Sequence, residues 1–291
     1  MTDAARWDTV TVVGCGLVGA SFALALKRAG ACRRVAGWDV SPAALDEALA
    51  RGCIDEVDRS FAATDAVSPS DLVYLATPVG QIIEFLRTRA GQVKAGAVVT
   101  DAGSTKTEVC RAAREAKGRG WSFVGGHPVA GGHRGGPAHA RADLFEGAPY
   151  VLASVEDGSD PAALASVEEM LERIGARVRV LSAREHDRAL ALTSHLPQLL
   201  SSALASIVED DADPDALRAL SGPGYRDMTR LAESDWRVWR DIFLTNPAAV
   251  ADALERLLPK LTAARDELRQ HSYDGGGALR ATAALFNNSS Q

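Results

Sequence analysis

Several features that mark whole classes of protein are missing from this chain. No uninterrupted apolar run approaches the roughly 20 residues that a membrane-spanning helix needs, and the first residues lack the basic-then-apolar profile of an export signal. The 4 cysteines are scattered among 291 residues, without the paired spacing of a metal site or the density of a disulfide framework. We therefore expect no membrane insertion, no metal site, reduced thiols and a cytoplasmic location.

Positive charge is also in short supply. The chain has 38 Asp and Glu residues against 32 Lys and Arg residues, which gives a formal net charge of -6. Nonspecific binding to nucleic acid needs a cationic face, because its affinity comes from contacts to phosphates. The charge balance therefore argues against a nucleic-acid partner, and an anionic small molecule has to be met by local positive groups.

What remains is the composition of an ordinary globular protein, with 46% hydrophobic and 24% charged residues. The length allows two medium domains. From residue 9 to about 182, short apolar runs alternate with helical stretches, and strands are expected at residues 10–13, 35–38, 72–75, 97–100, 122–124 and 176–180. These runs are mostly apolar on both faces, as in a parallel sheet covered by helices on each side. Residues 1–182 are therefore expected to form a doubly wound α/β domain of Rossmann type.

The pattern changes after residue 182. Residues 183–270 have helical periodicity and no convincing strand, so residues 183–291 are expected to form an all-helical domain with a flexible tail from about residue 273. Asn246-Pro247 is a helix start signal, and an apolar stripe that includes Val250, Leu254 and Leu261 follows it. That stripe either packs inside its own domain or is buried against a partner subunit, and the second alternative predicts a homodimer.

A glycine pattern, G-x-G-x-x-G, joins the first predicted strand to a helix. Gly14 permits the turn, Gly16 removes a side chain where a pyrophosphate would approach, and Gly19 allows helix to pack on strand. The pattern alone is weak, because a tight turn without a ligand uses the same glycines. Asp39 strengthens it, since an acid at the end of the next strand would accept hydrogen bonds from ribose hydroxyls.

A carboxylate at this position also repels the phosphate that distinguishes NADP from NAD, so NAD is the predicted cofactor. Thr77-Pro78 ends the next strand at the same edge and would line the cofactor or simply end the strand. The predicted cofactor-binding residues are Gly14, Gly16, Leu17, Val18, Gly19, Asp39, Thr77 and Pro78.

His127 is the best single clue to the chemistry. It follows the predicted strand at 122–124 in the run GGHPVAGG, where glycines allow close approach and proline fixes the backbone. A neutral imidazole, with a reference pKa of about 6.5, suits a general base at neutral pH. Ser104 follows the preceding strand, and its hydroxyl either orients the His127 ring or, with Thr105 and Glu108, caps the next helix.

Taken together, these segments resemble the prephenate and arogenate dehydrogenases of tyrosine biosynthesis. The resemblance runs from residue 10 to about 246 and includes Ser-His-Leu-Pro at 194–197, Thr-Arg-Leu-Ala at 229–232 and the segment at 239–243. Members of this family oxidise the ring C4 alcohol of prephenate or arogenate by hydride transfer to a nicotinamide, with loss of the C1 carboxylate as carbon dioxide. The resemblance implies that His127 takes the C4 hydroxyl proton and that Ser104 hydrogen-bonds near it.

The resemblance assigns further roles in the second domain. Arg230 matches an arginine that holds a substrate carboxylate, although a surface pair with Asp227 is the alternative. His195 matches a histidine beside the nicotinamide. Trp239 matches a tryptophan near the substrate, but together with Trp236 it would equally anchor a helical core.

One loop departs from the family pattern. His133 and Arg134 follow two glycines where many relatives carry Thr or Ser and then Glu or His. Their positive charge favours prephenate, a dianion, over arogenate. His186 lies nine residues before His195, on roughly the opposite helical face, and is interpreted as an ordinary surface or packing residue.

Three alternatives stay open. The first is an arogenate-preferring or dual-specificity dehydrogenase. The second is a dehydrogenase of β-hydroxy acids, but these rely on a helix-borne lysine, and Lys260 is the only lysine after residue 182. The third is a nicotinamide-binding sensor without turnover, which would keep the glycine loop but would not need His127, Ser104 and Arg230.

Overall fold

The computed structural model describes residues 7–62, 66–116, 120–132, 134–154, 159–274 and 279–287. Contacts divide the chain into two compact units. The first comprises Met1–Asp187 and Ser234–Asn246, and the second comprises Arg188–Glu233 and Pro247–Gln291. Residues 234–246 therefore pack with the first unit, although they lie within the part of the sequence expected to be a helical domain.

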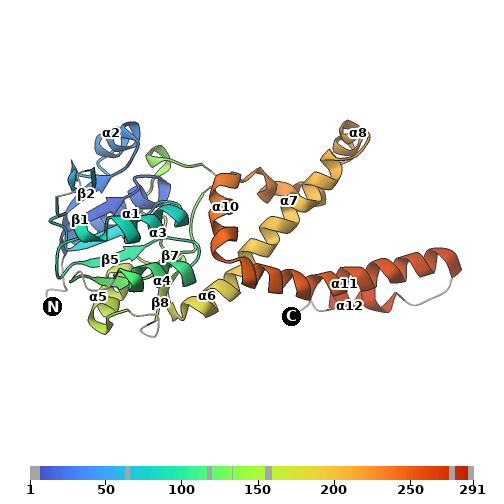
Figure 1. The fold of residues 1–291 in the computed structure, drawn as a ribbon. Helices are drawn as coiled ribbons and strands as arrows, with labels where there is room; N and C mark the ends of the chain where they lie inside the picture. Colours follow the sequence, from blue (N-terminus) through green and yellow to red (C-terminus); the bar gives the residue numbers. More distant parts are fainter. Residues whose placement is uncertain are drawn as a thin grey trace. The chain divides into compact units, whose positions relative to one another are not determined.

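A six-stranded parallel sheet forms the centre of the first unit (Figure 1). Its strands are β1 (Trp7–Val13), β2 (Cys32–Trp38), β3 (Glu56–Val57), β4 (Leu72–Leu75), β5 (Val98–Asp101) and β6 (Ser122–Val124). The spatial order is β3-β2-β1-β4-β5-β6, so the direction of winding reverses between β1 and β4. This order confirms the predicted doubly wound Rossmann-type fold, and the reversal is where such sheets bind ligands.

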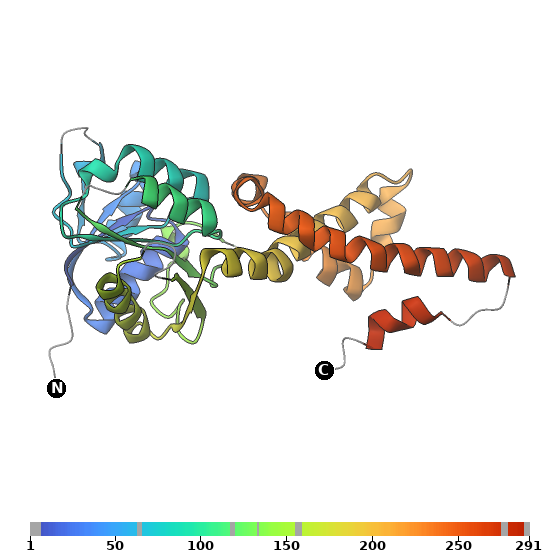
Figure 2. The same cartoon turned by 60° about the horizontal axis from the view of Figure 1, so that its bottom comes forward.

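Helices cover both faces of this sheet (Figure 2). The helices are α1 (Leu17–Ala29), α2 (Pro42–Ala50), α3 (Val79–Thr88), α4 (Thr107–Glu115) and α5 (Pro161–Arg173). Alternate residues of one strand serve the two cores: Leu72 and Tyr74 pack with α1 and α5, whereas Val73 and Leu75 pack with α3 and α4. Both faces are therefore buried, which explains the continuous apolar runs in the sequence.

A second, smaller sheet carries His127. It contains β7 (Gly126–Pro128), β8 (Pro149–Ala153) and β9 (Arg177–Leu181), with β7 antiparallel and β9 parallel to β8. The strand expected at 176–180 exists, but it pairs with β8 in this sheet and does not belong to the large parallel one. Its residues are exposed or half-buried, unlike those of the central strands. His127 pairs with Val151, so its backbone is held by a strand and not by a free loop.

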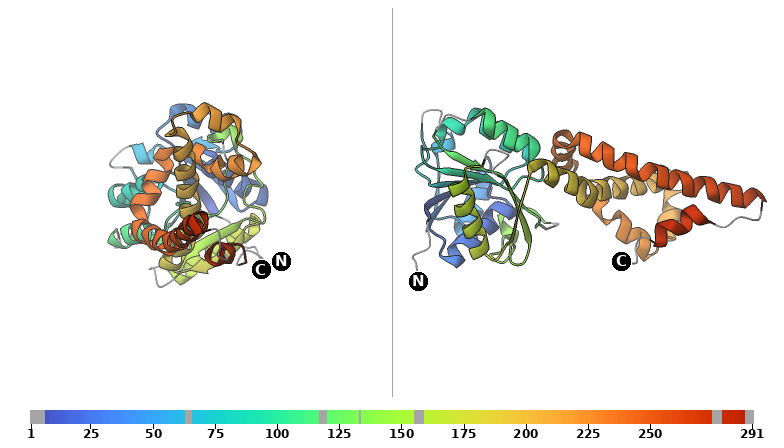
Figure 3. Two further views of the ribbon diagram at one scale, coloured as in Figure 1. Left: turned by 90° about the vertical axis from the view of Figure 1, so that its right-hand side faces the viewer. Right: turned by 90° about the horizontal axis from the view of Figure 1, so that it is seen from below.

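The described part of the second unit is all helical (Figure 3). It contains α7 (Leu196–Glu209), α8 (Pro214–Ala219), α9 (Pro223–Thr229), α11 (Pro247–Asp274) and α12 (Arg280–Asn287). The helix α6 (Ala183–Leu190) begins in the first unit, to which α10 (Trp236–Thr245) also belongs. The predicted start at Asn246-Pro247 is confirmed by α11. In the part of the tail that is described, Glu267 caps α12 by accepting hydrogen bonds from the amides of Ala281 and Thr282.

Among the described residues, no helix combines the length and the apolar character that crossing a membrane requires.

Candidate active site

The glycine loop between β1 and α1 is built by close backbone approaches. Gly14 has a φ of 95°, and a Cβ there would lie 2.7 Å from the Ala76 carbonyl oxygen. A Cβ on Gly19 would lie 2.0 Å from the Gly14 carbonyl oxygen, so only glycine lets α1 begin this close to the strand. Gly16 differs, because no other atom lies within 4 Å of its Cβ position. That free space opens toward the cavities beside the loop.

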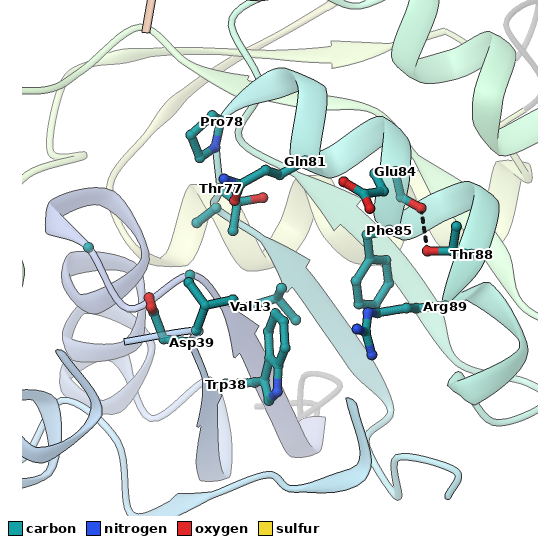
Figure 4. Close-up of a pocket in the computed structure, with 14 residues that line it drawn as sticks. Val13, Trp38, Asp39, Thr77, Pro78, Gln81, Glu84, Phe85, Thr88 and Arg89 are labelled. Atoms are coloured by element: carbon teal, nitrogen blue, oxygen red, sulfur yellow. Dashed lines mark hydrogen bonds between the residues drawn. The ribbon is translucent and has the colours of Figure 1, made fainter. Parts of the chain in front are cut away.

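The first cavity, of about 440 Å³, lies at the carboxyl ends of β1, β2 and β4 (Figure 4). Gly14, Gly16, Asp39, Thr77 and Pro78 all line it. The Asp39 carboxylate accepts hydrogen bonds of 2.8 Å from the amides of Cys15 and Ser41, which hold it at the rim. The carboxylate is thus fixed next to the glycine loop, where a ribose would lie.

One wall of this cavity is flat and aromatic. Trp38 and Phe85 line it, and the Arg89 guanidinium carbon lies 5.5 Å from the centroid of the Trp38 ring (Figure 4). Arg89 also donates a hydrogen bond to the Phe61 carbonyl, which holds the guanidinium in place. Such a wall offers stacking surface to a planar base.

The second cavity, of about 310 Å³, shares Gly16, Thr77 and Pro78 with the first. It is also lined by Leu17, Val18 and Ser104. Of the eight predicted cofactor-binding residues, Gly19 alone lines neither cavity, because it packs α1 on the loop instead. Two cavities joined at the glycine loop offer room for the two halves of a dinucleotide.

Asp101, the last residue of β5, positions the strand that carries His127. Its carboxylate accepts hydrogen bonds from the amides of Gly103 (2.8 Å) and Gly126 (2.9 Å), and it pairs with the Lys106 ammonium, both side chains being fully buried. Ser104 lies between these anchored residues. The loop at 102–106 between β5 and α4, here called the Ser104 loop, and β7 are therefore held by one carboxylate.

His127 is 8% exposed, and its ring contacts a second histidine that the sequence did not single out. The distance from its Nδ1 to the Nε2 of His186 is 2.7 Å, with the ring planes at 76°. His186 is fully buried, and its Nδ1 lies 2.8 Å from the Oδ1 of Asp187. The interpretation of His186 as an ordinary surface or packing residue is therefore wrong. His127 and His186 are 59 residues apart, and no local signal in the sequence shows their contact.

Asp187 holds the start of α4. Its two carboxylate oxygens accept hydrogen bonds from the amides of Lys106 (2.7 Å) and Thr107 (2.8 Å). Burial by itself would raise the pKa of Asp187, but the hydrogen bonds from His186 and from the first residues of α4 lower this pKa below its usual value. The helix start is thus capped by Asp187. The alternative of a Thr105 cap is wrong, because the Thr105 hydroxyl lies 2.7 Å from that of Thr245.

The helix α10 closes one side of the second cavity. Val238 and Ile242 line the cavity, while the Asp241 carboxylate accepts a hydrogen bond from the Gly80 amide at the start of α3. Trp239 is half-buried, and its ring centroid lies 5.8 Å from that of Phe243. At the end of α10, the Asn246 side chain donates a hydrogen bond to the Asp187 carbonyl, 2.8 Å away.

Two of the remaining predicted site residues, His195 and Arg230, belong to the second unit. His195 is buried at the end of a π-helical turn (Ala191–His195), directly before α7. Pro197 has no amide hydrogen to give to a helix, and such turns are frequent at functional sites. Arg230 is exposed at the end of α9, and His133 lies outside the described residues.

Comparisons with known proteins agree across most of the chain. The family model "Prephenate dehydrogenase, nucleotide-binding domain" matches residues 22–180, and "Prephenate dehydrogenase, dimerization domain" matches residues 182–282. Prephenate dehydrogenase of Lactococcus lactis subsp. cremoris is 33% identical over 93% of this chain and 76% of its own length. Cyclohexadienyl dehydrogenase of Zymomonas mobilis is 32% identical over 91% of this chain and 90% of its own.

A crystal structure of prephenate dehydrogenase from A. aeolicus, in complex with hydroxyphenyl propionate and NAD+, has a similar fold. The TM-score is 0.85 at 28% identity, covering 97% of this chain and 96% of that one. With both of its parts matched by models of one family, in the expected order, this chain belongs to the prephenate dehydrogenase family.

Proposed function

We propose that this protein is an NAD-dependent prephenate dehydrogenase, which converts prephenate to 4-hydroxyphenylpyruvate and carbon dioxide. The observation that carries the proposal is that a dinucleotide-binding loop and the buried His127 lie in one unit of a chain that belongs to this family. The named relatives and the NAD+ complex of a similar structure support the same activity.

The residues of the glycine loop fit NAD. The open space at Gly16 leaves room for a pyrophosphate at the start of α1, where helix amides favour anions. Asp39 lines the same cavity and would repel a phosphate on the adenosine ribose. When bound, NAD+ supplies the acceptor for the hydride that leaves ring carbon C4.

The protein's own residues handle the proton and the substrate. His127 takes the proton of the C4 hydroxyl as the C4 carbonyl forms. The bond between C1 and its carboxylate then breaks and carbon dioxide leaves. The electron pair of that bond moves through the ring to the C4 oxygen, which takes up a proton as the ring becomes aromatic. Ser104, which lines the second cavity, would orient the hydroxyl, so that the reacting oxygen and the base stay aligned.

The remaining assignments follow family membership. Arg230 would grip a substrate carboxylate through two parallel hydrogen bonds, Trp239 would lie near the substrate, and His195 would contribute to the pocket beside the nicotinamide. His133 would add positive charge near the substrate. The activity of variants at these positions tests these roles.

A group of basic residues favours prephenate over arogenate. Arg134, His139 and Arg141 line a third cavity of about 290 Å³, which shares Leu17 and two glycines with the second cavity. Positive charge there attracts the keto-acid dianion and repels the ammonium group of arogenate. Dual specificity is the second candidate, and the cyclohexadienyl dehydrogenase among the relatives favours it.

We further propose that two copies associate through the second unit, which matches the dimerization domain of the family. The first part of the predicted stripe, at Val250 and Ala253, is buried within the chain, but Leu258 and Leu261 after it are 55% and 48% exposed. Exposed apolar residues on a helix suit an interface with a second copy. The four cysteines are all buried thiols, which suits the reducing cytoplasm.

A direct assay tests the activity. Purified protein is given NAD+ with either prephenate or arogenate, and the absorbance of NADH is followed. We expect a kcat/KM for prephenate at least about tenfold above that for arogenate, a difference of about 1.4 kcal/mol. Equal values would establish dual specificity, a higher value for arogenate would reverse the preference, and no NADH with either substrate would overturn the proposed function. Light scattering of the same sample measures whether it is dimeric.

A further inference from the structure

The contact between His127 and His186 bears on which nitrogen of the His127 ring carries hydrogen, as well as on where the ring lies. A neutral imidazole carries its hydrogen on one nitrogen only, so the partner of each nitrogen decides which one can act as a base. The chain His127, His186, Asp187 has two ring–partner contacts of 2.7 and 2.8 Å, and the donor in each depends on which ring nitrogen carries hydrogen. The direction of both hydrogen bonds follows from the last member of the chain.

Asp187 can only accept. Its carboxylate already accepts from the amides of Lys106 and Thr107, and the lowered pKa keeps it ionised at neutral pH. The Nδ1 of His186 must therefore carry hydrogen and donate it to Oδ1. In the neutral ring the Nε2 of His186 is then bare, which makes it an acceptor. Its partner, the Nδ1 of His127, has to be the donor.

We propose that His186 and Asp187 are positioning residues that hold His127 in the form protonated at Nδ1, which leaves Nε2 as the atom that takes the substrate proton. The proposal rests on the proposed function for the identity of the substrate. The proton balance is simple: the hydroxyl O–H bond breaks, an Nε2–H bond forms on His127, and no proton is transferred from His127 to His186 or from His186 to Asp187. The arrangement follows the logic of a histidine oriented by a buried carboxylate, with a second ring between them.

The same chain stabilises the charge that appears on His127. Once protonated at both nitrogens, His127 donates from Nδ1 to His186, whose other nitrogen donates to the Asp187 carboxylate. Asp187 is 3% exposed and His186 is fully buried, so water screens this attraction little. Among the described contacts, a second charged pair, Lys106 with Asp101, lies near β7, because Asp101 accepts a hydrogen bond from the Gly126 amide. The opposite charges of this pair offset each other, so the pair adds little net charge near His127.

The pair is rigid, as a positioning role demands. The Asp187 carboxylate is fixed by the first amides of α4, and its carbonyl accepts from Asn246. These bonds attach His186 to elements that also form the walls of the second cavity, since the Ser104 loop leads into α4.

Two substitutions at His186 separate positioning from packing. In His186→Gln the amide oxygen can take the place of Nε2 and accept from His127, whereas in His186→Asn the side chain reaches Asp187 but is too short for His127. We expect kcat to fall by about 10- to 100-fold in His186→Asn, with KM nearly unchanged, and by clearly less in His186→Gln. The control is His271→Asn, at an exposed histidine of α11, which should leave kcat unchanged. Equal losses in the Gln and Asn variants would contradict the positioning role.

A measurement on the unaltered protein needs neither activity nor variants. Two-dimensional ¹⁵N–¹H spectra that detect the ring nitrogens show which of them is protonated, and the chain has only 6 histidines to assign. At about pH 9, where imidazoles are ordinarily neutral, we expect His127 and His186 both to carry hydrogen on Nδ1. Hydrogen on the Nε2 of His127 would overturn the inference. A wild-type protein that oxidises neither substrate, but has this pattern, would overturn the proposed function alone.

Discussion

Gly126 and Asp101 approach so closely that no side chain fits between them. A Cβ on Gly126 would lie 2.5 Å from the Asp101 carbonyl oxygen, and the Gly126 amide donates to the Asp101 carboxylate. Gly126 directly precedes His127 on β7. The glycine before the proposed base is therefore required by the passage of β7 against the end of β5, so the position of the base depends on it.

Gly126→Ala should disturb both stability and catalysis. The added methyl group has to displace β7 or Asp101, and overpacking of this kind costs about 1–3 kcal/mol. Urea unfolding measures that loss, and kcat should fall because His127 moves with the strand. Gly224→Ala, in α9, is the control, since no atom beyond its own helix and chain neighbours lies within 4 Å of its Cβ position. Two variants of equal stability and activity would show that β7 adapts without cost.

His127→Ala should remove most of the turnover and leave NAD binding intact. A positioned general base contributes about 10²- to 10⁴-fold to a rate, and we expect kcat to fall within that range. Calorimetric titration with NAD checks that the dinucleotide site is unchanged, since His127 lines neither of the first two cavities. Near-normal activity would refute the assignment of the base.

Arg230→Ala should raise the KM for prephenate far more than it lowers kcat. Hydrogen bonds between charged groups contribute about 1.5–3 kcal/mol, which corresponds to roughly a 10- to 100-fold change in KM. Arg226→Ala removes an exposed arginine of α9 that donates to the Ser221 carbonyl, and it should change KM little. An unchanged KM in Arg230→Ala would favour the alternative of a surface pair with Asp227.

Asp39→Ala should weaken the discrimination between NAD and NADP. The substitution removes the negative charge that faces the ribose, and it also leaves the Cys15 amide without its acceptor, so the KM for NAD should rise while that for NADP falls or stays constant. Asp46→Ala, at an exposed position of α2, serves as the control. If the ratio of the two KM values does not move, Asp39 does not select the cofactor.

Lys106→Met should destabilise the protein strongly. It leaves the buried Asp101 carboxylate without its positive partner, at a cost of about 3–5 kcal/mol in the free energy of unfolding. Lys94→Met breaks the ion pair with Asp71, whose side chains are each 34% exposed, and such surface pairs contribute only about 0–1 kcal/mol. Unfolding in urea compares the two variants, and a small loss in Lys106→Met would show that water reaches Asp101.

The features that the sequence predicts correctly are those with a local cause. Gly14 takes the positive φ of its turn, Gly19 approaches the carbonyl of Gly14 nearby in the chain, and Pro247 begins α11 because its missing amide hydrogen costs nothing in a first turn. The buried strands reveal themselves by apolar residues on both faces. By contrast, β7 consists of Gly, His and Pro, so it has no apolar run that would mark it as a strand in the sequence.

The sequence by itself determined the Rossmann-type fold and the dinucleotide loop, since both are marked by patterns of residues that are close along the chain, and it predicts the role of His127. Only the tertiary structure decided that His186 and Asp187 stand behind His127 and that α10 packs with the first unit. The physical reason is that the hydrophobic pattern of the sequence shows which side chains are buried in the folded protein. Which buried polar groups then satisfy one another depends on contacts between distant segments, as with the cap that Asp187 gives to α4.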